Sequence, residues 1–104
     1  MTRQQILESA LQCVNGDRQQ DYGSPEQNFL SIANMWNTYI LSTGHKFLDA
    51  KDVAAMLALL KIIRIASGHA KADNWIDLAG YAACGGEIEI TDLENRIEDV
   101  SINE

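Results

Sequence analysis

The sequence predicts an all-α domain, a four-helix bundle-like fold with a short C-terminal helix and an acidic tail. Apolar residues recur at spacings of three and four along most of the chain, which is the period of an amphipathic helix. Capping residues and glycines stand where these periodic segments would begin and end. The one alternating run, residues 87–90, is too short and isolated to predict a sheet.

Two helices are predicted in the first half of the chain. Thr2 can cap a helix over residues 3–15, and Gly16 is its stop signal. After a polar connection, Ser24 and Pro25 supply the N-cap and first-turn proline of a second helix that ends before Gly44. Its core-facing stripe is predicted to consist of Phe29, Ile32, Ala33, Trp36, Tyr39 and Ile40.

The third helix is predicted to be the central element of the fold. Asp49 and Asp52 occupy the N-cap and N3 positions of a capping box, and the helix runs to about Ser67, before Gly68. Apolar side chains surround nearly its whole circumference, which is typical of a helix packed on several sides. These are Val53, Met56, Leu57, Leu59, Leu60, Ile62, Ile63 and Ile65.

The last third of the chain predicts two further helices. A turn at residues 69–72 leads into a fourth helix that reaches about Cys84 and is broken by Gly85 and Gly86. A second capping-box pattern at residues 91–94 predicts a short helix over about 92–99, followed by a frayed acidic end. We therefore divide the chain into a helical domain, residues 1–90, and a short helix with an acidic tail, residues 91–104.

Charge is distributed unevenly. The formal net charge is -7, and residues 87–104 contain seven acids and a single base, so that residues 1–86 are near neutral with eight acids and seven bases. This pattern argues against binding to duplex nucleic acid, which requires a basic surface. A small anionic ligand held by a few bases is compatible with it, and the acidic tail could engage a basic protein partner.

Several broad properties follow from composition. Cys13 and Cys84 are far apart and lack the spacing of a zinc site or disulfide scaffold, so both are predicted to be reduced and buried. No apolar run approaches eighteen residues without charge, and the N-terminus does not resemble a signal peptide, so we expect a cytoplasmic protein without membrane contact. A domain of 104 residues buries a modest share of its surface, so a homo-oligomer is expected.

Two carboxylates make residues 73–81 the most informative stretch. Asp73 and Asp77 are four apart, so they share one face of the fourth helix about 6 Å from each other, among apolar and small residues. Such acids are either paired within the protein or bind a hard cation. Alternatively, Asp73 is the N-cap of a helix that starts at Asn74, which leaves Asp77 alone to be explained.

Lys61 and Arg64 point the same way from the third helix because they are three residues apart. They either extend to solvent along their apolar stems or clamp a phosphate or carboxylate. The C-terminal dipole of their own helix also favours cations there. Asp52 lies nine residues before Lys61, about 13 Å away along the axis, so it is favoured as a cap over one edge of an elongated site.

Other candidate ligand residues lie near the second and fourth helices. Tyr22 and Gly23 precede a helix N-terminus that could hold an anion, or they form a simple turn. Asn28 could hydrogen-bond a ligand edge or a neighbouring backbone group. Trp36 and Trp75 are predicted core residues, although either could offer a ring for a base to stack on.

Four segments of the chain resemble a family of small phage and prophage proteins that is defined as a domain of unknown function. They are DYGSPEQNF (21–29), IA (32–33) together with Trp36, DVAAMLALLKIIR (52–64) and DNWIDLAGY (73–81). The resemblance covers about residues 15–90, and it implies a phage-type protein in the cytoplasm of a bacterial host cell. Tyr81, which ends the last motif, joins the candidate ligand-binding residues.

More distantly, the helical pattern and the acid-rich DLAGY helix resemble the all-α nucleoside triphosphate pyrophosphohydrolases of the MazG type. That resemblance implies Mg²⁺ held by carboxylates of neighbouring helices, and cleavage of nucleotides to monophosphate and pyrophosphate. The paired Glu-x-x-Glu that supplies half of the metal site in that class is absent here. Glu26 and Asp52 are the nearest substitutes.

Three hypotheses result. In the first, Asp73 and Asp77, with Asp52 or Glu26, hold Mg²⁺ while Lys61 and Arg64 bind the phosphates of a nucleotide that is hydrolysed. In the second, the same residues hold a nucleotide or a nucleotide-derived signal without cleaving it. In the third, the chain is a protein interaction module with an anti-defence or regulatory role.

Overall fold

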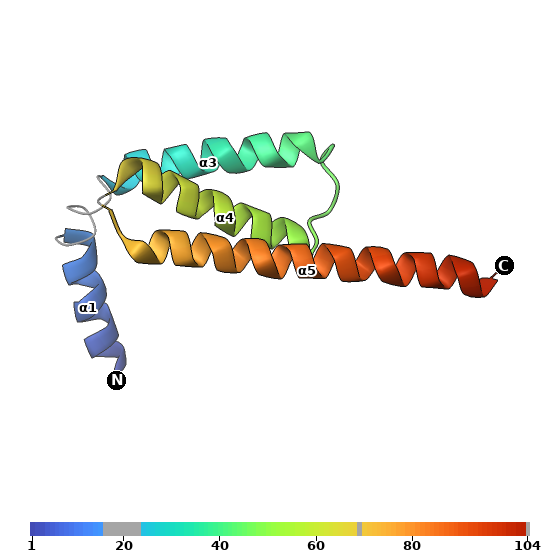
Figure 1. Cartoon of the computed structure of the whole chain (residues 1–104). Helices are drawn as coiled ribbons and strands as arrows, with labels where there is room; N and C mark the ends of the chain where they lie inside the picture. The colour runs from blue at the N-terminus through green and yellow to red at the C-terminus, as the bar shows by residue number, and fades with distance from the viewer. Residues whose placement is uncertain (16–23, 69, 104) are drawn as a thin grey trace.

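The computed structural model describes residues 1–15, 24–68 and 70–103, and nearly all of them are helical. The helices are α1 (Arg3–Asn15), α3 (Pro25–Ser42), α4 (Ala50–Ser67) and α5 (Ala72–Asn103), as Figure 1 shows. The described ranges contain no strand, so the all-α prediction is confirmed.

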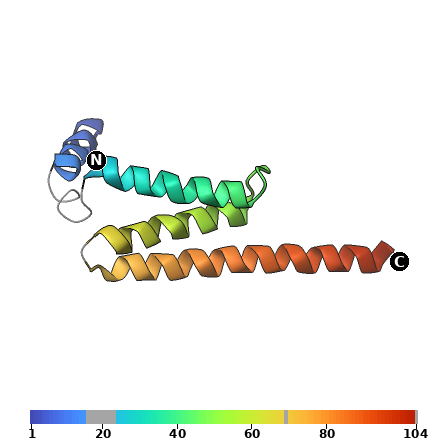
Figure 2. The same ribbon diagram turned by 90° about the horizontal axis from the view of Figure 1, so that it is seen from above.

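Helix α4 is the middle element, as predicted, because it packs against both α3 and α5. The three helices run side by side with alternating direction, and α1 lies apart from them (Figures 1 and 2). The result is elongated, with principal extents of 61 × 33 × 25 Å. None of the described helices is long and apolar enough to cross a membrane.

The predicted start signals are confirmed at the first three helices. Thr2 Oγ1 accepts a hydrogen bond from Gln5 N at 3.2 Å, and Ser24 Oγ accepts one from Gln27 N at 3.3 Å. The capping box of α4 is complete: Asp49 Oδ1 accepts from Asp52 N at 3.2 Å, and Asp52 Oδ2 accepts from Asp49 N at 2.9 Å. Each bond satisfies an N–H that the first helical turn leaves without a partner.

The predicted break at Gly85 and Gly86 is wrong. Helix α5 is 32 residues long and continues through both glycines. The short helix that we expected over residues 92–99 is part of it. Gly85 lies where α5 passes close to α4: a Cβ at this position would stand 3.0 Å from the Cβ of Ala54. The glycine therefore permits a close helix contact, and this packing outweighs its low helix propensity.

The described residues bury little apolar surface. Ile32 is the one buried hydrophobic side chain among them, and the polar residues Asp52 and Asn74 are also buried. Phe29 and Ala33, which we predicted to face the core, are exposed. Cys13 and Cys84 are free but exposed, so the prediction of buried thiols is also wrong. The reason is geometric: three helices in one layer cover each other along two lines of contact, and most of their other faces are uncovered.

Candidate functional site

One predicted base and one predicted acid meet where α4 packs against α5. Lys61 Nζ lies 2.7 Å from Asp77 Oδ2, and the Lys61 side chain is 12% exposed whereas that of Asp77 is 45% exposed. Arg64 follows Lys61 by three residues in α4, and Asp73 precedes Asp77 by four in α5. We call these four residues the acid–base cluster. Its bases and acids come from different helices, as the sequence suggested.

We expected the acids to hold a cation and the bases to hold an anion, but one base and one acid of the cluster contact each other. Asp77 and Lys61 form a direct ion pair, so Asp77 is neutralised by the protein's own cation. Helix α5 begins at Ala72, so Asp73 lies in its first turn, where the helix dipole favours a carboxylate. Within the described ranges, no three His, Cys, Asp or Glu side chains are grouped to hold a metal ion.

Asp52 lies near the other end of α4 and is completely buried. Tyr39 donates its hydroxyl to Asp52 Oδ1 at 2.5 Å, and the amines of Lys51 and Lys46 lie 3.5 and 3.9 Å from the two carboxylate oxygens. With the backbone N–H of Asp49, each oxygen has two partners. Asp52 is thus a helix cap that also ties α3 to α4, and its separation from Lys61 keeps it away from the acid–base cluster.

These contacts perturb three pKa values. The hydrogen bond from Tyr39, followed by that from the Asp49 backbone, lowers the pKa of Asp52 below its ordinary 3.8. The same hydrogen bond and burial raise the pKa of Tyr39 above 10.0, and the charge of Asp52 raises that of Lys51 above 10.5. The folded state therefore favours a charged Asp52, a neutral Tyr39 and a charged Lys51.

We expect the stability of the fold to depend on pH at both extremes. The lowered pKa of Asp52 stabilises the fold above pH 3.8, and this contribution is lost as the pH falls further. The raised pKa values of Tyr39 and Lys51 stabilise the fold below about pH 10, and their contribution is lost at higher pH. Urea unfolding followed by circular dichroism from pH 3 to 11 measures this. The difference between wild type and Asp52→Asn should shrink below pH 3.8, and a constant difference would contradict the assignment.

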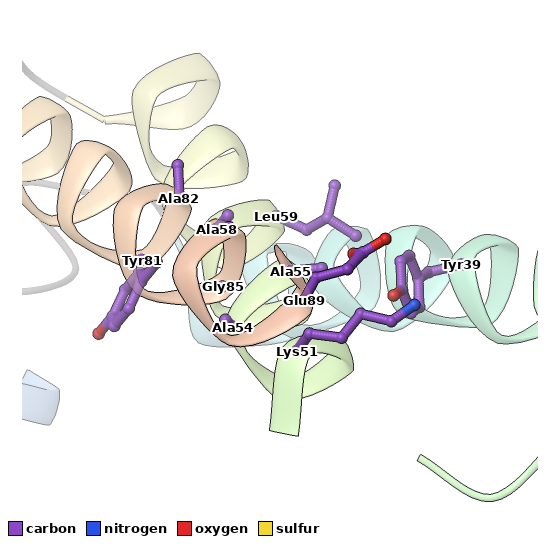
Figure 3. Close-up of a pocket in the computed structure, with 11 residues that line it drawn as sticks. Tyr39, Lys51, Ala54, Ala55, Ala58, Leu59, Tyr81, Ala82, Gly85 and Glu89 are labelled. Carbon is purple, nitrogen blue, oxygen red and sulfur yellow. The ribbon is translucent and has the colours of Figure 1, made fainter. Parts of the chain in front are cut away.

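A cavity of about 400 Å³ lies along α4 and α5, and its lining includes Tyr39 and Lys51, which contact Asp52. Small residues of both helices form much of its wall: Ala54, Ala55, Ala58, Ala82, Gly85 and Gly86. Figure 3 shows Tyr39, Lys51 and Glu89 at one end and Tyr81 at the other. Of these four residues, Tyr81 was predicted as a ligand residue and Tyr39 only as a core residue, whereas Lys51 and Glu89 were not predicted. The sequence signal for this cavity is the set of small residues spaced by three and four on both helices, which predict close packing.

The remaining predicted ligand residues are scattered. Trp36 donates its indole N–H to Met56 O at 2.8 Å and so holds α3 on α4, which agrees with a structural role. Trp75, also predicted to be core, is exposed. Asn28 is half-buried and Glu26 exposed near the start of α3, while Tyr22 and Gly23 lie outside the described residues.

Comparison with known sequences now gives the family. The domain of unknown function DUF6378 matches residues 5–89. The chain belongs to this family. It is also 37% identical to the Gene 55 protein of Mycobacterium phage L5 over 89 residues, covering 86% of this chain and 55% of that protein. No solved structure matches.

A second relative is the Gene 55 protein of Mycobacterium phage D29, which is 37% identical over 79 residues, 76% of this chain and 50% of that protein. The chain thus spans about half the length of the curated relatives it matches. These matches confirm the resemblance to phage proteins of unknown function. The family match ends within α5, so the last turns of that helix lie beyond it.

Proposed function

We propose that this chain is a phage accessory protein that binds a nucleotide or a nucleotide-derived ligand at the acid–base cluster. The observation that carries the proposal is the contact of 2.7 Å between Lys61 and Asp77, side chains of two helices that meet where solvent can enter. Arg64 follows Lys61 by three residues, so the two bases are neighbours on one side of α4.

The unequal exposure of the pair suggests how a ligand would enter. Lys61 is mostly buried, and a buried ammonium needs an anionic partner. Asp77 is nearly half exposed, so water can solvate its carboxylate if Lys61 turns away. A phosphate could therefore replace Asp77 as the partner of Lys61, and Arg64 could add a bidentate contact.

This exchange would also release Asp77 for a cation. In proteins Mg²⁺ is commonly held by one or two carboxylates together with the phosphates of a bound nucleotide and water. Asp73 and Asp77, on one face of α5, can supply those two carboxylates. Because the described residues contain no larger group of ligands, we propose that Mg²⁺ enters with the nucleotide, not before it.

Binding without cleavage is the version that we favour. Pyrophosphohydrolysis would use the metal to polarise a phosphoryl oxygen and orient a water. A second carboxylate pair of the MazG type is absent, and Asp52, one of its suggested substitutes, has both oxygens engaged. Hydrolysis is therefore the alternative, to be tested in the same experiment.

Lys61→Ala is expected to weaken nucleotide binding at least tenfold, because a charge-assisted hydrogen bond contributes about 1.5–3 kcal/mol. Isothermal titration calorimetry with a panel of nucleoside triphosphates and nucleotide-derived signals, with and without Mg²⁺, measures the loss. Lys46→Ala, which removes the same charge near the opposite end of α4, is the control and should bind like wild type.

Asp77→Asn separates the roles of the two partners. It should abolish any dependence on Mg²⁺ while leaving Lys61 available to phosphate, so affinity without Mg²⁺ is retained or increased. Pyrophosphate release by wild type, absent in Asp77→Asn, would establish hydrolysis. If no phosphorylated compound of the panel binds to wild type, the proposal is rejected.

A second candidate is a protein interaction module. Helix α5 carries six of the seven acids of residues 87–104, and it extends past the start of α4 (Figures 1 and 2). A basic partner would recognise this charge. Binding of such a partner would not depend on Lys61, whereas removal of residues 91–104 would abolish it. The Lys61→Ala variant and the truncated chain therefore give opposite results for the two candidate functions.

A further inference from the structure

Helix α5 has two faces of low polarity, and α4 covers one of them. Leu78, Tyr81, Gly85 and Ile88 are half-buried against the body of the fold. A second row, of which Gly86 also borders the cavity, runs along α5, and each of its members is exposed: Ile76, Ala79, Ala83, Gly86, Ile90, Leu93 and Ile97. We call this row the α5 seam. We propose that it is an antiparallel interface with the α5 seam of a second copy of this chain.

The spacing of the seam is that of a coiled coil. Its members are separated alternately by three and four residues over three heptads, which keeps them on one side of a helix that winds around another. The large members are far from buried, with exposed fractions from 48% for Leu93 to 63% for Ile76. A regular apolar stripe of this length on a helix in water calls for a helical partner.

The surface area indicates how much is uncovered. The chain exposes 7901 Å², whereas a compact protein of its mass, 11.5 kDa, exposes about 5,800 Å². The excess of about 2,000 Å² is spread over α1 and the uncovered helix faces, and it exceeds the roughly 800 Å² that each partner contributes to an interface of standard size. The radius of gyration of 18.3 Å, against about 13 Å for a compact domain of this length, agrees.

Side-chain size favours the antiparallel direction. If Ile90 of one copy faces Leu93 of the second, then Ile97 faces Gly86, so two layers pair isoleucine with glycine and two pair isoleucine with leucine. Parallel pairing in register would instead place Gly86 against Gly86, which leaves a gap at that layer. The antiparallel register fills the Gly86 layers with Ile97 and pairs the seam over residues 86–97.

Charge favours the same register. Arg96 is the only base of residues 87–104, and the antiparallel pairing brings it to Glu89 of the second copy, twice by symmetry. Both directions oppose one pair of acids, Glu87 to Glu94 in the antiparallel case and Glu89 to Glu94 in the parallel case, but parallel pairing gives Arg96 no acidic partner. The paired layers, residues 86–97, begin nine residues after Asp77 of the acid–base cluster, and the interface does not depend on ligand binding.

Analytical ultracentrifugation of the full chain tests the interface. Wild type should sediment at twice the chain mass. Ile90→Asp should raise the dimer dissociation constant about a hundredfold, because a carboxylate would enter an apolar layer twice. Thr91→Asp, one residue along and off the seam, should leave the dimer intact. A monomeric wild type, or equal behaviour of the two variants, would overturn the proposal.

Charge reversal tests the direction without altering the apolar layers. Arg96→Glu should raise the dissociation constant about fivefold, and the double variant Glu89→Arg/Arg96→Glu should restore it. Asn95→Asp, on the opposite side of α5, controls for added negative charge. In a parallel dimer Arg96→Glu would have little effect and the double variant would associate more tightly than wild type, and this result would overturn the antiparallel arrangement.

Discussion

Asp52→Ala is expected to lower the melting temperature of this domain by about 15 °C. The substitution removes the acceptor of the Tyr39 hydroxyl and one half of the capping box, and it leaves the amines of Lys46 and Lys51 without their shared carboxylate. Donors that lose a buried acceptor destabilise a fold more than the loss of a surface contact does. With so little apolar surface buried, the fold has few other contacts between α3 and α4 to compensate.

Thermal unfolding followed by circular dichroism measures the shift. Asp49→Ala is the matched control, because it removes the other half of the capping box but leaves the Tyr39 hydrogen bond in place. It should lower the melting temperature by about a third as much. Equal shifts for the two variants would mean that Asp52 serves only as a helix cap and does not connect the helices.

Gly85→Leu is expected to destabilise the fold by about 2 kcal/mol. A Cβ at this position stands 3.0 Å from the Cβ of Ala54, so any larger side chain must push α5 away from α4. Gly80→Leu places the same residue in the same helix where a Cβ meets nothing within 4 Å. There the gain in helix propensity should stabilise the fold by up to about 0.8 kcal/mol.

Urea unfolding of the two leucine variants gives these free energies directly. Opposite signs for the two substitutions would establish that Gly85 is selected by packing and not by a turn. If Gly85→Leu were as stable as Gly80→Leu, the close approach of α4 and α5 would be contradicted, and with it the shape of the cavity between them.

Much of the architecture was predictable from local signals. The starts of α1, α3 and α4 depend on a side chain and a backbone N–H two or three residues away, so Thr2, Ser24 and Asp49 could be assigned from sequence alone. The central place of α4 followed from apolar residues around its whole circumference. Lys61 and Asp77 were both selected from the sequence, but their direct ion pair was not predicted.

What failed depended on neighbours distant in sequence. A pair of glycines reads as a break unless another helix lies against it, as Ala54 does here. An apolar stripe on α3 predicts a core only if enough elements cover it, and Phe29 is exposed because none of the described helices does. Tyr39, which donates a hydrogen bond to Asp52, lies thirteen residues earlier in the chain, so no local sequence pattern predicts this contact.

The sequence by itself determined the helical class, most helix boundaries and the central element, because these follow from capping and periodicity within a few residues. Only the tertiary structure decided that α5 is one uninterrupted helix, that Lys61 pairs with Asp77, and that Asp52 is enclosed by Tyr39 and two lysines. These features arise where helices distant in the chain approach each other, and the free energy of that packing outweighs the local preferences of the residues involved.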